Sequence, residues 1–178
     1  IGNYEKESGY QSFVLSSDNN GQVWHYTENA KNTLSTVAYS GNTLVSVGFN
    51  RNGPLTLYSE DNGISWQAGK IEGVPEGIKV GYLRGVDCVD TACFAVGYSR
   101  STPGQVYLLK STDSGKTWLY NLNMFGADEA NLDIFNYSMS CNPNVCLAYN
   151  LYDYLATHDS GLSWTYQPLV NGTHTIIR

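Results

Sequence analysis

The chain has 178 residues, of which 42% are apolar and 15% charged, with a formal net charge of −6 and a pI near 4.9. Its length suits one domain, and its apolar runs are too short to span a membrane, so membrane insertion is not expected. The acidic balance and the scattered Lys and Arg argue against nucleic-acid binding, which requires clustered basic residues.

Predicted strands follow one another along the whole chain. Ahead of residue 17 there is a short stretch that contains IGNYEK, too short for a complete sheet. Alternating apolar residues and turn signals then predict three groups of four strands. These are residues 34–40, 43–49, 55–60 and 65–70; residues 82–88, 93–99, 105–111 and 116–122; and residues 135–141, 145–150, 154–159 and 162–168. Residues 125–133 (FGADEANLD) are expected to form at most one helical turn.

An eight-residue phrase occurs four times between these strands. It occupies residues 17–24 (SDNNGQVW), 59–66 (SEDNGISW), 111–118 (STDSGKTW) and 157–164 (THDSGLSW). The shared positions are Ser17, Asn19, Gly21 and Trp24; Ser59, Asp61, Gly63 and Trp66; Ser111, Asp113, Gly115 and Trp118; and Thr157, Asp159, Gly161 and Trp164. Asp or Asn accepts N–H groups of a turn, Gly supplies positive φ, and Trp enters the next strand as an apolar wedge. Each phrase therefore predicts one β-hairpin tip.

A second repeat supports the first. Residues 37–48, 86–97 and 139–150 align without a gap, and each indicates two short strands with a tight connection. The four tryptophans recur at intervals of 42, 52 and 46 residues, a period typical of one four-stranded propeller blade.

The phrase resembles the Asp-box, the hairpin signature of sialidases, sortilin-type receptors, certain xyloglucanases and photosystem assembly factors, all of which are β-propellers. The first copy departs from the pattern at Asn19 and Val23, which weakens its turn network. The resemblance implies an all-β propeller of about four four-stranded blades, with the box between the third and outermost strands of a blade, away from the ligand-binding channel. Residues 1–178 would form one domain.

The expected blades are residues 1–30 completed by a C-terminal strand from 172–178, then 31–72, 80–123 and 132–170. Completing the first blade in this way removes unpaired sheet edges. Two alternatives remain open: a fragment of a larger ring, and half of an eight-bladed ring in which two chains exchange the last strand as a homodimer.

The four cysteines form two Cys-x4-Cys pairs, Cys88 with Cys93 and Cys141 with Cys146. Each pair faces across a predicted hairpin, within disulfide range, so two disulfides are expected. The alternative is a four-cysteine zinc site; we expect no metal and no cofactor. Disulfides, together with a first residue other than Met, favour a secreted or periplasmic protein.

Neither a catalytic triad nor a catalytic carboxylate pair stands out, so no catalytic residue is assigned. The resemblance implies three arginines and an Arg-Ile-Pro segment for a sialidase; the chain has only Arg51, Arg84, Arg100 and Arg178, and lacks the segment. Acidic candidates for a glycosidase pair are Asp87, Asp90, Asp128, Glu129, Asp133 and Asp153. The histidines, His25, His158 and His174, are far apart in the sequence.

The favoured function is therefore non-enzymatic: a recognition or scaffold module that binds a glycan, a peptide or a protein. Residues 69–82 and 121–136 are the candidate contact loops. Candidate contact tyrosines are Tyr98, Tyr107, Tyr120, Tyr137, Tyr149, Tyr152 and Tyr154. The alternatives are a carbohydrate-active enzyme, or a fragment of one, and an assembly factor.

Overall fold

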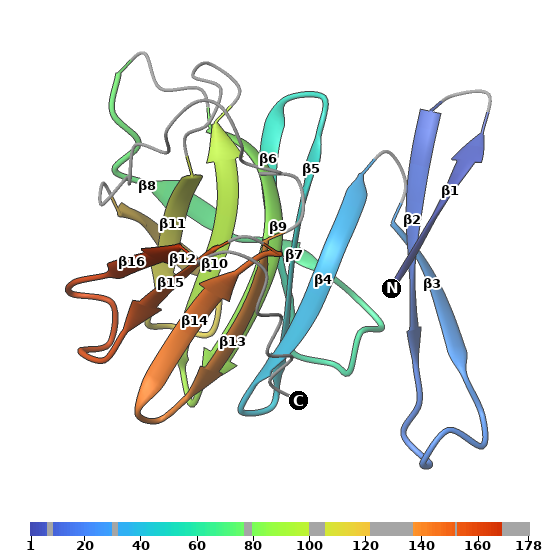
Figure 1. Ribbon diagram of the computed structural model, residues 1–178. Coiled ribbons are helices and arrows are strands. Elements are labelled where there is room, and N and C mark those ends of the chain that lie inside the picture. Colours follow the sequence, from blue (N-terminus) through green and yellow to red (C-terminus); the bar gives the residue numbers. More distant parts are fainter. Residues whose placement is uncertain are drawn as a thin grey trace.

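The computed structural model describes residues 1–6, 9–29, 32–76, 80–99, 106–121, 137–151 and 153–168. The regular secondary structure of these residues consists of β-strands in four sheets, which confirms the all-β class (Figure 1). The helical turn predicted in residues 125–133 lies outside the described residues. Within the described ranges, no helix has the length and apolar character needed to cross a lipid bilayer.

The first sheet contains three strands, β1 (Gly2–Lys6), β2 (Gly9–Ser16) and β3 (His25–Asn29), each antiparallel to the next. Alternation along β2 turns Val14 toward the second sheet, where it is buried, and leaves Leu15 on the opposite, exposed face. The first box connects β2 to β3, so these two strands correspond to the third and fourth strands of the other sheets. The strand from 172–178 that is predicted to complete this sheet lies outside the described residues.

The second sheet follows the prediction closely. Its strands are β4 (Thr33–Ser40), β5 (Thr43–Asn50), β6 (Gly53–Ser59) and β7 (Gln67–Ala68), in that order across the sheet. The second box connects β6 to the short β7. A register shift between Leu34 and Thr36 marks a bulge near the beginning of β4.

The third sheet contains a strand that the sequence analysis missed. Its four predicted strands are present as β9 (Val80–Val89), β10 (Ala92–Ser99), β11 (Val106–Ser111) and β12 (Thr117–Asn121). In addition, β8 (Lys70–Glu72) leaves the second sheet and pairs in parallel with β12. The prediction of residues 69–82 as a free contact loop is therefore wrong over β8 and the beginning of β9. The physical reason is that β8 pairs with the otherwise open outer edge of β12.

The fourth sheet contains β13 (Ser138–Asn142), β14 (Val145–Tyr149), β15 (Asp153–Thr157) and β16 (Thr165–Pro168). All three pairings between neighbouring strands are antiparallel, and the fourth box connects β15 to β16. Of the second predicted contact loop, 121–136, only its first residue, at the end of β12, is described.

The four sheets are arranged in sequence order, with the first-position strands β4, β9 and β13 side by side at a common hub. A separate apolar cluster fills the space between each successive pair of sheets. In Figure 1 the first sheet stands at the right, at the far end from β15 and β16 of the fourth sheet. The described strands form an open series rather than a closed ring, so a complete propeller is not established by the sheet pairing.

The four box hairpins share one hydrogen-bond pattern. In the second box, Ser59 Oγ accepts from Gly63 N and donates to Asp61 Oδ1, both at 2.8 Å. Asp61 Oδ1 also accepts from Ser65 N at 2.8 Å, and Asp61 Oδ2 accepts from Ser65 Oγ at 2.6 Å. In the first box Asn19 Oδ1 still accepts from Val23 N at 2.8 Å, but Val23 has no hydroxyl for the additional bond. The turn is thus retained there with a smaller network.

Each box turn requires two consecutive residues with positive φ. Besides the glycine, the residue before it has φ of 57° or 58°; these residues are Asn20, Asn62, Ser114 and Ser160. From the sequence, positive φ in these turns was expected at the glycines alone. The pair matches a type I′ turn, whose twist agrees with that of the two strands it connects.

The hydrogen bonds of the box stabilise the ionised form of its carboxylate. The Ser65 hydroxyl, followed by the Ser65 backbone N–H and the Ser59 hydroxyl, lowers the pKa of Asp61 to about 2 from 3.8. Hydrogen bonds from Ser163 likewise lower the pKa of Asp159. A carboxyl group with a depressed folded-state pKa stabilises the protein above its unfolded pKa, and that stabilisation is lost as the pH falls through the folded-state value.

We therefore expect the free energy of unfolding to fall as the pH is lowered from about 3.8 to about 2. Asp61→Asn introduces the residue that the first box has at the equivalent position, Asn19, and is expected to remove part of the pH dependence of the free energy of unfolding. Urea denaturation at a series of pH values measures it. Asp18→Asn, which neutralises an exposed carboxylate in the first box, serves as the control and keeps the wild-type slope. An unchanged slope in Asp61→Asn would contradict the expectation.

Both cysteine pairs form disulfides, Cys88–Cys93 and Cys141–Cys146, across the first hairpins of the third and fourth sheets. The cysteines are therefore not thiolates that could form the alternative zinc site. The Asp87 carboxylate accepts from Cys88 N at 2.9 Å and from Cys141 N at 2.7 Å, which links the two sheets.

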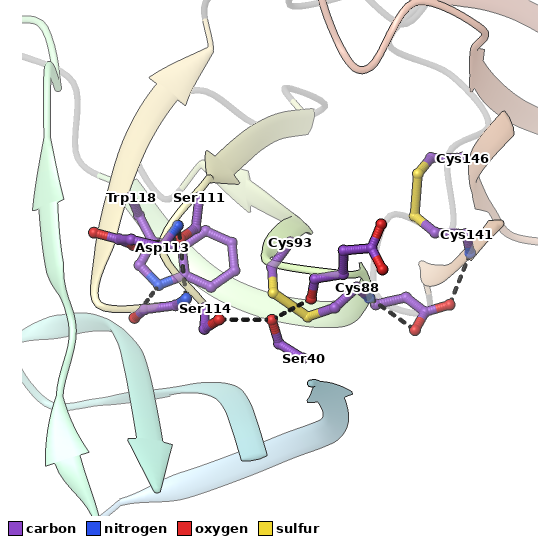
Figure 2. The surroundings of a disulfide bond; sticks show 12 residues. Ser40, Cys88, Cys93, Ser111, Asp113, Ser114, Trp118, Cys141 and Cys146 are labelled. Carbon is purple, nitrogen blue, oxygen red and sulfur yellow. Dashed lines mark hydrogen bonds between the residues drawn. A yellow bond between two sulfur atoms is a disulfide. The ribbon is translucent and has the colours of Figure 1, made fainter. Parts of the chain in front are cut away.

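The second and third sheets are linked in a similar way at the same end. Ser40 Oγ donates to the Asp90 carbonyl at 2.6 Å and lies 2.9 Å from Ser114 Oγ of the third box (Figure 2). First hairpins and boxes of neighbouring sheets thus contact one another at this end of the sheets.

Candidate binding site at the hub

A shallow, mostly polar depression of about 320 Å³ lies where the inner strands of the sheets meet. It is lined by Asn3 of β1, residues 33–35 of β4, Arg84 of β9 and residues 137–138 at the beginning of β13. All four sheets, including the incomplete first one, contribute to it. The polar groups that face it come from different elements, as do the polar groups that orient ligands in many binding sites.

The depression and the box hairpins lie at opposite ends of the sheets. The first and third strands of a four-stranded antiparallel sheet run in the same direction. Because β4 and β13 begin at the depression, β6 and β15 end at the other side, where they enter their boxes. This agrees with the implication of the resemblance that the boxes lie away from the ligand site.

Arg84 supplies the positive charge among the described lining residues. Its guanidinium carbon lies 5.4, 5.6 and 5.7 Å from the ring centroids of Phe49, Tyr82 and Tyr98. Its Nε is buried without a hydrogen-bond partner, and no described carboxylate forms an ion pair with it. A guanidinium presents its donors in a fixed plane that matches a carboxylate. The chemistry of the site therefore suits a planar anionic group.

The aromatic side chains around Arg84 come together through strand geometry. Tyr82 and Arg84 lie two residues apart on β9, where a register shift leaves Arg84 as the extra residue of a bulge, and Tyr98 of β10 is paired with Tyr82 in register. Phe49 near the end of β5 meets Tyr82 edge to face at 4.1 Å. Tyr98 was expected as a contact from the sequence, whereas Arg84 was considered only as one of four arginines, and Phe49 and Tyr82 were not expected. The sequence feature that could have identified the site is a positively charged residue, Arg84, within the largely apolar strand β9.

Tyr137, which also lines the depression, belongs to a buried polar group. Its hydroxyl donates to Asp153 Oδ1 at 2.5 Å, and the Tyr166 hydroxyl donates to Asp153 Oδ2 at 3.3 Å. Burial, and then the hydrogen bond to Asp153, raise the pKa of the Tyr137 phenol well above its ordinary value. Asp153 is itself buried. The phenol is thus a firmly neutral donor that holds a buried carboxyl group.

The structure does not bring two acidic candidates together in the depression. Asp87 joins the two disulfide hairpins, Asp90 is exposed in a turn, and Asp153 is buried against Tyr137. The remaining acidic candidates, Asp128, Glu129 and Asp133, lie outside the described residues. His25 and His158 are exposed, and His174 lies outside the described part. Within that part, no group of three or more His, Cys, Asp or Glu side chains could hold a metal ion.

Most of the candidate contact tyrosines pack inside the sheets. Those that are buried are Tyr98, Tyr107, Tyr120 and Tyr137. Tyr149 is exposed, Tyr154 is half-buried, and Tyr152 is not among the described residues. Burial therefore makes Tyr107 and Tyr120 packing residues, and of the described candidates only Tyr98 and Tyr137 are associated with the depression.

Comparison with known proteins supports the resemblance drawn from the repeats. The BNR/Asp-box repeat family model matches residues 57–68. Among solved structures, the K499G mutant of NanB sialidase from Streptococcus pneumoniae is 14% identical with a TM-score of 0.60, over 90% of this chain and 29% of that chain. The same sialidase in complex with 2-[(3-chlorobenzyl)ammonio]ethanesulfonate is also 14% identical, with a TM-score of 0.55 and the same coverage.

A protein of unknown function from Dyadobacter fermentans is 15% identical with a TM-score of 0.50, over 94% of this chain and 51% of that chain. No curated protein sequence matches the chain. The chain spans less than a third of the length of the NanB sialidase chains, and at these identities the likeness concerns the fold alone. The chain therefore carries a BNR/Asp-box repeat, and its fold is similar to that of sialidases.

Proposed function

We propose that the protein is an extracytoplasmic recognition module that binds an anionic glycan in the hub depression, through a carboxylate placed against Arg84. Its four sheets act as propeller blades. The two disulfides support an oxidising compartment.

The observation that carries this proposal is the state of Arg84. A buried polar atom without a partner is costly, because it has lost water and gained nothing in exchange. Arg84 Nε is such an atom, in a guanidinium bordered by three rings and beside an open polar depression. A carboxylate would supply the missing acceptor, while the rings offer apolar area to the carbon face of a sugar. The NanB structures bear the name sialidase, which supports a saccharide as the ligand class.

Titration of carboxylated oligosaccharides, such as sialyllactose and oligogalacturonates, against neutral lactose tests the proposal by calorimetry. We expect binding of an acidic saccharide, and a loss of roughly 10- to 150-fold in Arg84→Ala, the equivalent of a charged hydrogen bond of about 1.5–3 kcal/mol. Arg84→Lys restores little of it, since lysine lacks the planar pair of donors.

The control is Lys116→Ala, which removes the same charge at the box end of the molecule and keeps wild-type affinity. Binding of neutral and acidic saccharides with equal affinity would contradict the proposal. If no saccharide binds and the protein captures a peptide or a protein instead, the result would contradict the proposal and support a scaffold or an assembly factor.

A second candidate function, a carbohydrate-active enzyme or part of one, is favoured by the contact between Tyr137 and Asp153. Tyrosine serves as the nucleophile in some glycosidases, and an adjacent carboxylate could accept its proton. The raised pKa of Tyr137 opposes this role, because the phenol holds its proton more firmly. Release of fluorophore from a panel of glycosides, abolished in both Tyr137→Phe and Asp153→Asn, would support the enzyme over the binding module.

A further inference from the structure

The first sheet exposes a set of large apolar side chains on the face turned away from the second sheet. Leu15 is 45% exposed, Trp24 58% and Tyr26 56%. Leu15 and Tyr26 are paired in register between β2 and β3, so their side chains share one face. Trp24 lies two residues before Tyr26, in the first box. We call this surface, formed by Leu15, Trp24 and Tyr26, the leading face.

The leucine position of the leading face is buried in the other sheets, and its tryptophan position is buried or half-buried there. The residue two places before each box is a leucine in all four repeats, and Leu57, Leu109 and Leu155 are buried. Trp118 and Trp164 of the third and fourth boxes are buried as well. Among the described residues, Leu15 and Trp24 of the first sheet thus lack the cover that the leucines and tryptophans of the third and fourth sheets have.

The cover elsewhere comes from the second strand of the preceding sheet. The third box packs on β5, since a Cβ at Gly115 would lie 2.7 Å from Val45 Cγ1, and Trp118 shares a core cluster with Val45. The fourth box packs on β10 in the same way: a Cβ at Gly161 would lie 2.5 Å from Phe94 Cε1, and Trp164 shares a cluster with Phe94. The third sheet thus packs on the second, and the fourth on the third, through the same contact between a box and the second strand of the preceding sheet.

The fourth sheet carries the next copy of this packing surface. In the aligned segments 37–48, 86–97 and 139–150, Val45 and Phe94 correspond to Leu147, and Val47 and Val96 correspond to Tyr149. Leu147 is only partly buried, and Tyr149 is exposed. We call the surface of Leu147 and Tyr149 on β14 the trailing face. The chain thus presents both halves of one interface, on its two terminal sheets.

We propose that a second copy of this chain docks its trailing face on the leading face, head to tail. Leu147 of one copy then packs against Trp24 and Leu15 of the other, as Phe94 packs against Trp164 within the chain. This differs from the strand exchange considered from the sequence, because it joins the faces of sheets and requires no transfer of the last strand. It is independent of the proposed glycan site, which lies in the hub.

Light scattering after size exclusion, over a series of protein concentrations, tests this inference. We expect the mass to rise from the 19.6 kDa of one chain to at least twice that value. Leu15→Lys and Leu147→Lys each keep the mass of one chain, since a lysine ammonium would have to be buried. An equimolar mixture of the two variants forms a heterodimer, because each variant retains the one face that the other has lost. This complementation distinguishes head-to-tail docking from other modes of association.

The matched control is Leu162→Lys, which alters an exposed leucine in the fourth box and keeps the wild-type association. Circular dichroism verifies that each variant is folded, and Tyr149→Lys replaces Leu147→Lys if the latter unfolds. A wild-type chain that keeps the mass of one chain at every concentration would overturn the inference. So would a mixture of the two variants that fails to form the heterodimer, or a loss of association in the control as large as in Leu15→Lys.

Discussion

Replacement of Trp118 by alanine is expected to lower the free energy of unfolding by about 3–5 kcal/mol, the usual cost of removing a large buried aromatic side chain. The indole is fully buried between the second and third sheets, in the cluster that contains Val45 and Leu109. Its Nε1 donates to the Gly115 carbonyl at 2.9 Å, so the substitution also removes this hydrogen bond between the tryptophan and the turn of the box. Urea unfolding followed by tyrosine and tryptophan fluorescence measures the change.

Trp24→Ala provides the matched control for this prediction. Trp24 occupies the same box position but is largely exposed, so its removal is expected to change stability by about 0.5 kcal/mol or less. The measurement is made in dilute solution, where the proposed docking between copies is absent. Equal losses for Trp24→Ala and Trp118→Ala would show that the box tryptophans do not stabilise the protein through packing between sheets.

Tyr137→Phe is expected to destabilise the protein by about 1–3 kcal/mol, the cost of leaving a buried acceptor without its donor. The variant preserves the ring and its packing but removes the donor to Asp153 Oδ1, a carboxyl oxygen in a buried site. Asp153 retains the longer contact from the Tyr166 hydroxyl at 3.3 Å, which cannot replace a bond of 2.5 Å. Thermal and chemical denaturation of the variant and the wild type give the difference.

Tyr39→Phe removes a hydroxyl from an exposed tyrosine of β4 and is expected to leave stability within about 0.5 kcal/mol of the wild type. A loss in Tyr137→Phe no larger than in this control would contradict the role given to the buried Tyr137–Asp153 pair.

The local turns could be predicted from the sequence because the chemistry that forms them is local. Asp61, Gly63 and their equivalents satisfy their hydrogen bonds within five residues, so the same letters form the same turn in every repeat. The strands of the second, third and fourth sheets follow from the alternation between these turns. Positive φ at Asn62 and its equivalents was missed because a polar residue before glycine is compatible with several turn types.

Features that depend on neighbouring sheets could not be read from the sequence. β8 belongs by sequence to the second sheet, but it pairs with the edge of β12 in the third, a contact set by the spacing between sheets. The burial of the box tryptophans could not be predicted either. All four boxes carry tryptophan at this position, but Trp24 is exposed while Trp118 and Trp164 are buried against the preceding sheet.

The candidate site was missed for a related reason. Arg84 lies 35 residues after Phe49 in the sequence, and the two meet only because β5 and β9 lie side by side. The alternation of Tyr82 and Arg84 was visible in the sequence. That Arg84 borders a depression, and that its Nε lacks a hydrogen-bond partner there, follows only from the packing of four sheets.

The placement of an anionic ligand against Arg84 is tested most directly by a thermodynamic cycle in which both the ligand and the protein are changed. The affinity for an acidic saccharide and for its methyl ester is measured by calorimetry in the wild type and in Arg84→Ala, and the coupling between the two changes is calculated. We predict that esterification weakens binding roughly tenfold or more in the wild type and has little effect in Arg84→Ala, because the carboxylate and the guanidinium interact directly. Equal effects of esterification in both proteins would contradict the placement of an anionic ligand against Arg84.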